Sequence, residues 1–144
     1  MNNEDTIHLL KECDAGSKMA VSSIDEVLDN VSDSNMKNIL QESKNHHADL
    51  GNKLHALLNS HGSSEKDPAL MAKGMSWMKT NMKLTMDDSD ATIADLMTDG
   101  CNMGIKSLYR YKNQYKAADK DSHALCDSLI SIEQELRSSL RQYL

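Results

Sequence analysis

The chain has 144 residues, of which 39% are hydrophobic and 26% charged, and its formal net charge at pH 7 is −6. These values are typical of one globular domain spanning 1–144, with enough residues for a hydrophobic core. The negative charge argues against a broad basic face for nucleic acid. No run approaches the roughly 20 apolar residues that a membrane span needs, and no basic amphipathic segment indicates a membrane surface.

Residue usage favours helices, because the chain has one Pro and no Phe and is rich in Leu, Met, Ala, Lys, Glu and Asp. The cysteines Cys13, Cys101 and Cys126 are odd in number, far apart and without a C-x-x-C pair. This pattern is typical of reduced thiols and not of a disulfide framework. The N-terminus lacks the basic start and apolar run of a signal peptide, so we expect a cytoplasmic protein.

Apolar residues at alternating spacings of three and four predict two long helices in the first part of the chain. The first covers about 4–31 and the second about 34–61. The segment 32–34 between them offers Ser and Asp side chains as N-caps, and Gly62 suits the end of the second helix. A connection this short makes the two helices antiparallel.

Two more long helices are predicted at about 89–117 and 120–143, and a shorter one at about 68–86. The second and third long helices are therefore about 27 residues apart, whereas helix connections in bundles usually have about 2–8 residues. A connection of this length has to run from one end of a bundle to the other. We predict an all-α, up-down four-helix bundle of two antiparallel hairpins joined by a long crossover containing the short helix.

The predicted crossover helix carries five of the ten methionines on one face. They are Met71, Met75, Met78, Met82 and Met86. An apolar stripe at this spacing is typical of core packing, and Met fills irregular gaps well. The alternatives are a Cu(I) site made of thioethers and an adaptable surface for a second subunit. No Cys or His falls between residues 62 and 100, which weakens the copper interpretation.

Polar residues interrupt the apolar spacing inside the first two helices. They are Asp14, Ser17, Ser43 and His47. Counting residues from the connection at 32–34 places Ser17 and His47 at nearly the same height along the bundle axis. Asp14 lies one helical turn further from this connection. In the third long helix, Gly100 and Gly104 leave room for a polar pocket or for a close approach of two helices. A buried His beside a carboxylate is a metal ligand, an acid–base group or a satisfied core residue that fixes register.

Glu42 and His46 are four residues apart, a spacing that can place two ligands on one metal ion. The same spacing also occurs by chance on solvated helix faces, where it has no function. The candidates for metal ligands are therefore Asp14, Glu42, His46 and His47. The sequence offers no Gly-rich phosphate loop and no ordered pair of nucleophile and base.

Four helices with a crossover resemble the ferritin-like superfamily, and more narrowly an uncharacterised bacterial branch of small ferritin-like four-helix bundles. The shared features are the segment GMSWMK with Gly74 and Trp77, the helix start DDSDATIADL, and then Gly100 and Tyr109. The resemblance covers almost the whole chain in layout.

Active ferritin-like proteins use a Glu from each of two helices and a Glu-x-x-His pair from each of the other two. In this chain Glu42 is followed by Asn45 where His belongs, although two histidines come directly after it. In the last helix Glu133 is followed by Leu136, and the predicted inner face is otherwise apolar apart from Ser139.

The other two helices also depart from the family pattern. The third long helix has no Glu, and the residues that would have to serve are Asp95, Asp99 or Cys101. The first helix offers Glu12 or Asp14. The resemblance therefore implies either a lost di-iron centre or a partial, mononuclear site at the four candidate ligands.

We therefore expect a non-catalytic structural or protein-interaction module without a cofactor. It would associate with itself or with another helical protein through a helix face. The alternative is a metal-binding ferritin-type oxidase or storage protein with a reduced ligand set, holding iron or another divalent metal. The two differ in whether Asp14, Glu42, His46 and His47 converge with carboxylates of the third long helix.

Overall fold

The computed structural model describes residues 4–62, 78, 81–83 and 86–144. Nearly all of this part of the chain is helical, and no strand occurs in it, so the predicted all-α class is confirmed. The elements are α1 (Glu4–Leu28), α2 (Ser34–Ser60), α4 (Asp90–Gln114), α5 (Lys120–Leu140) and the 3₁₀ helix η1 (Arg141–Tyr143). The predicted crossover helix at 68–86 lies largely outside the described residues.

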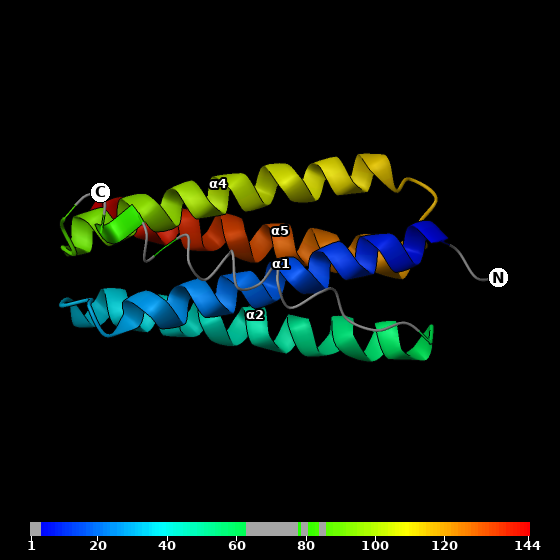
Figure 1. Ribbon diagram of the computed structural model, residues 1–144, viewed down its shortest axis with the longest axis horizontal. Helices are drawn as coiled ribbons and strands as arrows, with labels where there is room; N and C mark the ends of the chain where they lie inside the picture. The colour runs from blue at the N-terminus through cyan, green and yellow to red at the C-terminus, as the bar shows by residue number, and fades with distance from the viewer. Residues whose placement is uncertain (1–3, 63–77, 79–80, 84–85) are drawn as a thin grey trace.

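The four long helices lie side by side as two antiparallel hairpins, α1 with α2 and α4 with α5 (Figure 1). The backbone N–H of Asp33, in the turn of the first hairpin, donates to Asp90 at the start of α4 over 2.9 Å. The backbone N–H of Asp119, in the turn of the second hairpin, donates to Thr6 Oγ1 near the start of α1 over 2.8 Å. The end of α2 and the start of α4 therefore lie at opposite ends of the bundle, as the long connection predicted.

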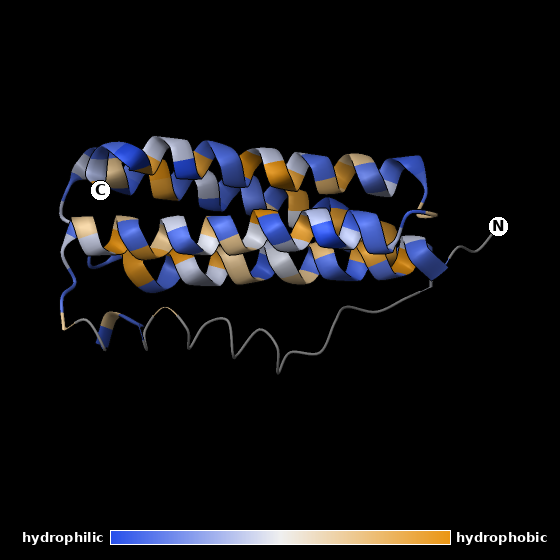
Figure 2. Cartoon of the chain, turned by 90° about the horizontal axis from the view of Figure 1, so that it is seen from above, coloured by the Kyte–Doolittle hydropathy of each residue, from blue (hydrophilic) through white to orange (hydrophobic). Residues whose placement is uncertain are grey.

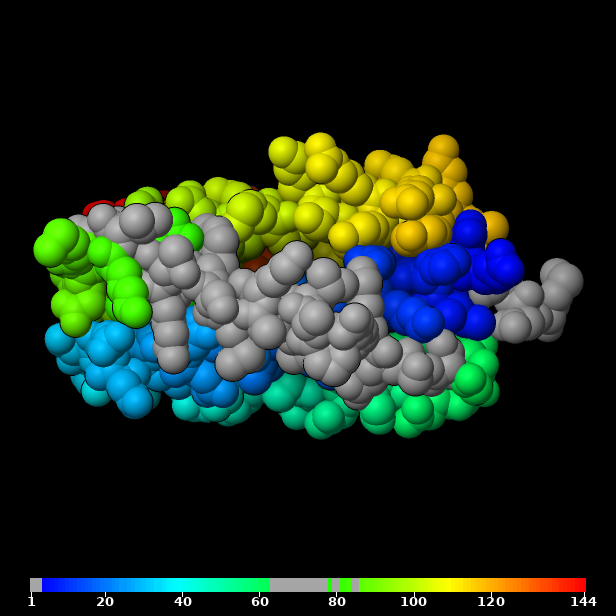
Figure 3. Space-filling model, viewed as in Figure 1, coloured from blue at the N-terminus to red at the C-terminus, as the bar shows by residue number. Residues whose placement is uncertain are grey.

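The helix α1 lies at the centre of these contacts, since it packs against α2, α4 and α5. Figure 3 shows its N-terminal half between α4 and α2 on one face of the molecule. The helices α1 and α5 run in one direction along the bundle, and α2 and α4 run in the opposite direction (Figure 1).

Polar side chains cap three of the helix starts. Asp33 caps α2, Ser89 caps α4 and Asp119 caps α5, each by accepting a hydrogen bond from the backbone N–H three residues later over 2.8–3.3 Å. These bonds satisfy donors that a helix start leaves free. Gly62 follows α2 with φ +70°, a conformation that glycine adopts without strain, so it ends the helix as predicted.

Three helices end about three residues before their predicted ends. α1 ends at Leu28, α4 at Gln114 and α5 at Leu140, after which the chain continues as η1. Val31 is nevertheless buried, because backbone hydrogen bonds in the turn fold it back onto the core. Apolar spacing therefore continues beyond a helix wherever the following turn still packs against the bundle.

The buried apolar residues form two clusters, one toward each end of the bundle. The first cluster, near the turn between α1 and α2, includes Ile24, Val27, Met36, Leu40, Ile93, Leu136 and Leu140. The second cluster, near the turn between α4 and α5, includes Leu9, Leu10, Leu54, Leu58, Leu108, Cys126 and Leu129. Figure 2 shows the apolar residues recurring along the helices at the spacing that builds these clusters. None of the described helices has the length and apolar character that a membrane span requires.

Alternating spacing places Met103 on the inner face of α4, and Ile132 and Ser139 on that of α5, and the structure differs from these predictions. In α4, Cys101 and Ile105 are buried, whereas Met103 is 49% exposed. In α5, Ile132 and Ser139 are only half-buried, and Glu133 is inside. The apolar residues of each helix cover a wide arc, so more than one line of alternating spacing can be drawn, and packing against three neighbours selects between them.

The described methionines of the predicted stripe fall into two groups. Met78 is buried in the first cluster and Met82 packs against its edge, which supports the packing interpretation for both. Met86 is 91% exposed, so its inclusion in a buried face is wrong. Its φ of +54° turns the chain out of the helical path. Met71, Met75 and Trp77 lie outside the described residues.

Candidate functional site

A layer of buried polar residues separates the two apolar clusters. At its centre His47 of α2 is fully buried, and its Nε2 lies 2.9 Å from Oε1 of Glu133 on α5, which is 8% exposed. The other ring nitrogen, Nδ1, lies 2.8 Å from the carbonyl oxygen of Ser43 and 3.3 Å from its hydroxyl. Both ring nitrogens of His47 are therefore engaged in hydrogen bonds inside the bundle.

These contacts fix the number of protons that the His47–Glu133 pair holds. The carbonyl of Ser43 can only accept, so Nδ1 of His47 carries a proton. The contact between Nε2 and Glu133 then needs a second proton, which makes the pair either imidazolium with carboxylate or imidazole with carboxylic acid. In both forms the pair is satisfied, as buried polar groups in proteins generally are.

Helix α4 presents a thiol and a glycine to Glu133. Burial raises the pKa of Cys101 well above its usual range and the charge of Glu133 raises it further, so Cys101 stays a thiol that hydrogen-bonds to this carboxyl group. A Cβ atom on Gly104 would lie 3.7 Å from the carboxyl carbon of Glu133. Gly104 thus faces a polar side chain, as predicted. Gly100 does not, because a Cβ atom there would have nothing within 4 Å.

Asp14 belongs to a separate part of the interior. It is fully buried, and Nζ of Lys18, one turn along the same helix, lies 3.0 Å from its carboxylate. A Cβ atom on Gly51 would lie 2.9 Å from Oγ of Ser17, so Ser17 is level with Gly51 and not with His47. The predicted common height of Ser17 and His47 is therefore wrong by one helical turn. Asp14 lies a further turn away, roughly 11 Å from His47 along the bundle.

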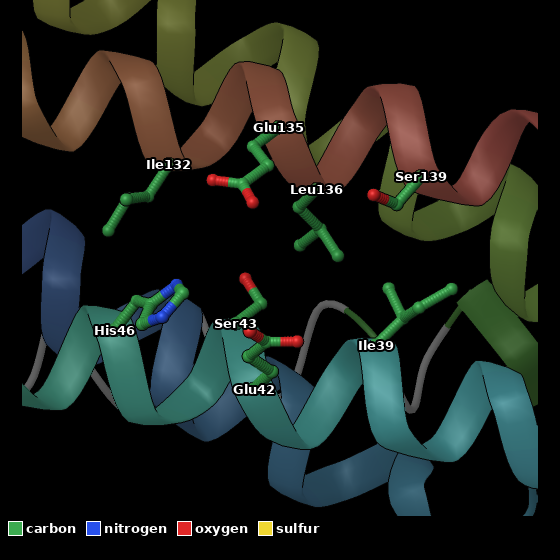
Figure 4. Close-up of a pocket in the computed structure, with 8 residues that line it drawn as sticks. All are labelled: Ile39, Glu42, Ser43, His46, Ile132, Glu135, Leu136 and Ser139. Atoms are coloured by element: carbon green, nitrogen blue, oxygen red, sulfur yellow. The ribbon is translucent and has the colours of Figure 1, made fainter.

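Glu42 and His46 lie outside the core, in a groove between α2 and α5. Both are exposed, and they line a groove whose volume of about 300 Å³ includes open solvent. The groove is lined by Ile39, Glu42, Ser43, His46, Ile132, Glu135, Leu136 and Ser139. Figure 4 shows the side chains of the two helices facing each other across it.

The four predicted ligands therefore do not converge. Asp14 contacts Lys18, His47 pairs with Glu133 in the core, and Glu42 and His46 line the outer groove. Among the residues with a described position, no three His, Cys, Asp or Glu side chains form a group that could hold a metal ion.

Glu133 was not predicted as the partner of His47. The predicted inner face of α5 is apolar apart from Ser139, whereas its buried face includes a carboxyl group. Two signals could have found it: a His at a core position needs a polar partner, and Glu133 was the Glu in the ligand pattern that the resemblance implied.

No protein-family model matches the chain, and neither a curated protein nor a solved structure matches it.

Proposed function

We propose that the protein is a non-catalytic relative of the ferritin-like superfamily that acts by binding a helix, from a second copy or from another protein, in the groove between α2 and α5. The observation that carries this proposal is the hydrogen bonding of His47. Its two nitrogens are taken by Ser43 and Glu133, so the interior histidine has no lone pair free for a metal or a substrate proton. The groove outside this layer is the candidate contact surface.

The shape and chemistry of the groove suit a helix. α2 and α5 each contribute four residues at positions i, i+3, i+4 and i+7, so the groove extends over two turns, roughly 10 Å. Its apolar residues are Ile39, Ile132 and Leu136, and its charged residues are Glu42 and Glu135. A partner helix would place apolar side chains between α2 and α5 and basic side chains beside the two carboxylates.

Self-association is tested by sedimentation velocity over a range of concentrations. We expect the mass of the wild-type protein to rise with concentration. The variant Ile132→Arg places a charge in the groove and should stay monomeric. Met103→Arg, at a 49% exposed apolar position on α4 that does not line the groove, should behave like the wild type.

A different protein as partner is tested by placing a photo-crosslinking amino acid at position 39 in the groove, with position 103 as the control. An adduct formed in cells only from position 39, and identified by mass spectrometry as one helical protein, supports the proposal. A monomer at every concentration that gives no adduct from position 39 overturns it.

The metal-binding alternative is tested by elemental analysis of untagged protein grown with iron, manganese, zinc and copper. Near-stoichiometric metal that is lost in Glu42→Ala would assign ferritin-type chemistry to the groove. Metal that is lost only in His47→Ala would assign it to the interior and would require the His47–Glu133 contact to open. Either result would replace the non-catalytic proposal.

A further inference from the structure

The helices α1 and α5 run in the same direction and keep one register over their N-terminal halves. Thr6 accepts the backbone N–H of Asp119 over 2.8 Å, and these two residues are 113 positions apart in the chain. The same separation relates Gly16 to Leu129, where a Cβ atom on Gly16 would lie 3.9 Å from Cδ2 of Leu129. Cys13 and Cys126 are also 113 positions apart, and they lie between these two contacts along the helices. The shared register therefore places them side by side.

Cys13 and Cys126 are both fully buried in the second cluster, and their thiols hydrogen-bond to each other. The sulfur of Cys126 also lies 3.8 Å from the carbonyl oxygen of Leu108, to which its S–H can donate. Both cysteines are free thiols. The sequence placed them far apart in the chain, but the parallel register of α1 and α5 makes them neighbours.

The two thiols differ in which one ionises first. The hydrogen bond to Cys126 and then burial raise the pKa of Cys13 far above its usual range. The hydrogen bond from Cys13 lowers the pKa of Cys126; burial opposes this shift, and the positive charge of Lys112 adds to it. The thiolate and not the thiol reacts with oxidants, and within the pair the hydrogen bond from Cys13 favours the thiolate at Cys126.

We propose that Cys13 and Cys126 form a modification site, a dithiol that hydrogen peroxide converts into an intramolecular disulfide joining α1 to α5. In the first step the Cys126 thiolate attacks one peroxide oxygen and the O–O bond breaks. The leaving hydroxide takes the proton that the thiol lost, which gives water and the sulfenic acid of Cys126. In the second step the sulfur of Cys13 attacks the sulfur of Cys126, the S–O bond breaks and a second water leaves. The two thiols lose two electrons and two protons, and one peroxide becomes two waters.

The reaction depends on entry of the oxidant to a buried pair. Local separation of the N-terminal part of α1 from the bundle opens the pair, because helix ends open at lower free energy than the whole fold. The sulfenic acid of Cys126 forms beside the thiol of Cys13. The second step is therefore intramolecular and needs no second molecule of oxidant.

Cys101 is the internal control for this proposal. It is as buried as the pair, at 2% exposure, but its polar neighbour is Glu133 and not a second thiol. A carboxyl group keeps it protonated and cannot resolve a sulfenic acid into a disulfide. Cys101 should therefore stay reduced under conditions that oxidise the other two cysteines.

The experiment exposes the full-length reduced protein to hydrogen peroxide and counts thiols after denaturation. We expect two of the three thiols to disappear and the intact mass to fall by two hydrogen atoms. A non-reducing tryptic digest should contain the Cys13 peptide joined to the Cys126 peptide, and dithiothreitol should restore all three thiols. Cys101→Ser should give the same linked peptides, whereas Cys13→Ser and Cys126→Ser should give none.

The wild-type digest decides the proposal even if a Ser variant does not fold. A disulfide that includes Cys101, a disulfide between two copies, or no loss of thiols at any peroxide concentration would overturn it. Oxidation of all three cysteines to sulfinic or sulfonic acids without the linked peptides would overturn it as well.

Discussion

The apolar clusters and the polar layer between them are built from the same four helices, yet they stabilise the bundle in different ways. In the clusters, side chains such as Leu54 and Ile93 gain stability by leaving water, and this gain depends little on direction. In the layer, His47 and Glu133 are stable inside only as a pair, in one alignment of α2 with α5. The clusters thus supply stability, whereas the layer selects register.

The largest expected effect comes from removing one member of the pair. His47→Leu removes the imidazole that hydrogen-bonds to the buried Glu133, and this loss costs about 1–3 kcal/mol of unfolding free energy for a neutral pair and about 3–5 kcal/mol for an ionic one. The measurement is urea unfolding at pH 7, followed by circular dichroism.

The double variant His47→Leu/Glu133→Leu separates the pair from packing. Well-packed apolar replacements for a buried ion pair are often neutral or stabilising, so the double variant should regain most of the loss. If the double variant is as unstable as His47→Leu, the layer stabilises the bundle by packing. The layer and the clusters would then not differ in how they stabilise the fold.

The next effect comes from the second cluster. Leu54 is fully buried, and Leu54→Ala should lower the free energy of unfolding by about 2–5 kcal/mol, because it removes apolar contacts and leaves a cavity. Leu57→Ala, at a half-buried position on the same helix, is the matched control and should cost clearly less. Equal losses of unfolding free energy at both positions would show that the contribution of a leucine to stability does not follow its burial in this cluster.

The fold was predictable because its determinants are local. Alternating spacing set the helix class, and the caps Asp33 and Ser89 fell in the polar segments that were predicted to start helices. The length of the connection after Gly62 predicted that the end of α2 and the start of α4 lie at opposite ends of the bundle, as they do. Errors of about three residues arose only where a turn kept an apolar residue against the core.

The contacts of the polar layer were not predictable in the same way. His47 was placed in the core by spacing, but its partner Glu133 lies 86 residues further along the chain, and no periodic rule connects them. The pairing of Cys13 with Cys126 has the same origin. Both contacts depend on the register between helices that are not neighbours in sequence, and that register is fixed by packing.

A smaller effect distinguishes two glycines inside helices. Gly100→Ala meets no neighbouring atom and should stabilise the protein by about 0.5–1 kcal/mol, because Ala loses less backbone entropy in a helix. Gly51→Ala would place Cβ 2.9 Å from Oγ of Ser17, which already donates to the carbonyl of Asp14, so this gain should be absent or reversed. Thermal unfolding of both variants tests this, and a gain at Gly51 equal to that at Gly100 would show that α1 and α2 do not approach closely there.

The smallest effect is a dependence on pH at the turn beside the first cluster. Asp33 accepts the backbone N–H of Met36 over 2.9 Å and the hydroxyl of Tyr143 over 2.8 Å, and these bonds hold the pKa of its carboxyl below its usual range. A carboxyl whose pKa is lower in the folded state adds stability above its unfolded pKa, about 3.9, and loses it as the pH falls through the folded pKa. The urea midpoint of the wild type should therefore fall as the pH is lowered below about 4.

The variant Asp33→Asn isolates this contribution, because Asn is as good an N-cap as Asp but does not titrate. It should keep the helix start and show a shallower fall in the urea midpoint over the same pH range. Asp99→Asn, at an exposed position that caps no helix, should follow the wild type. If Asp33→Asn and the wild type lose stability in parallel, the acid sensitivity does not come from the cap of α2.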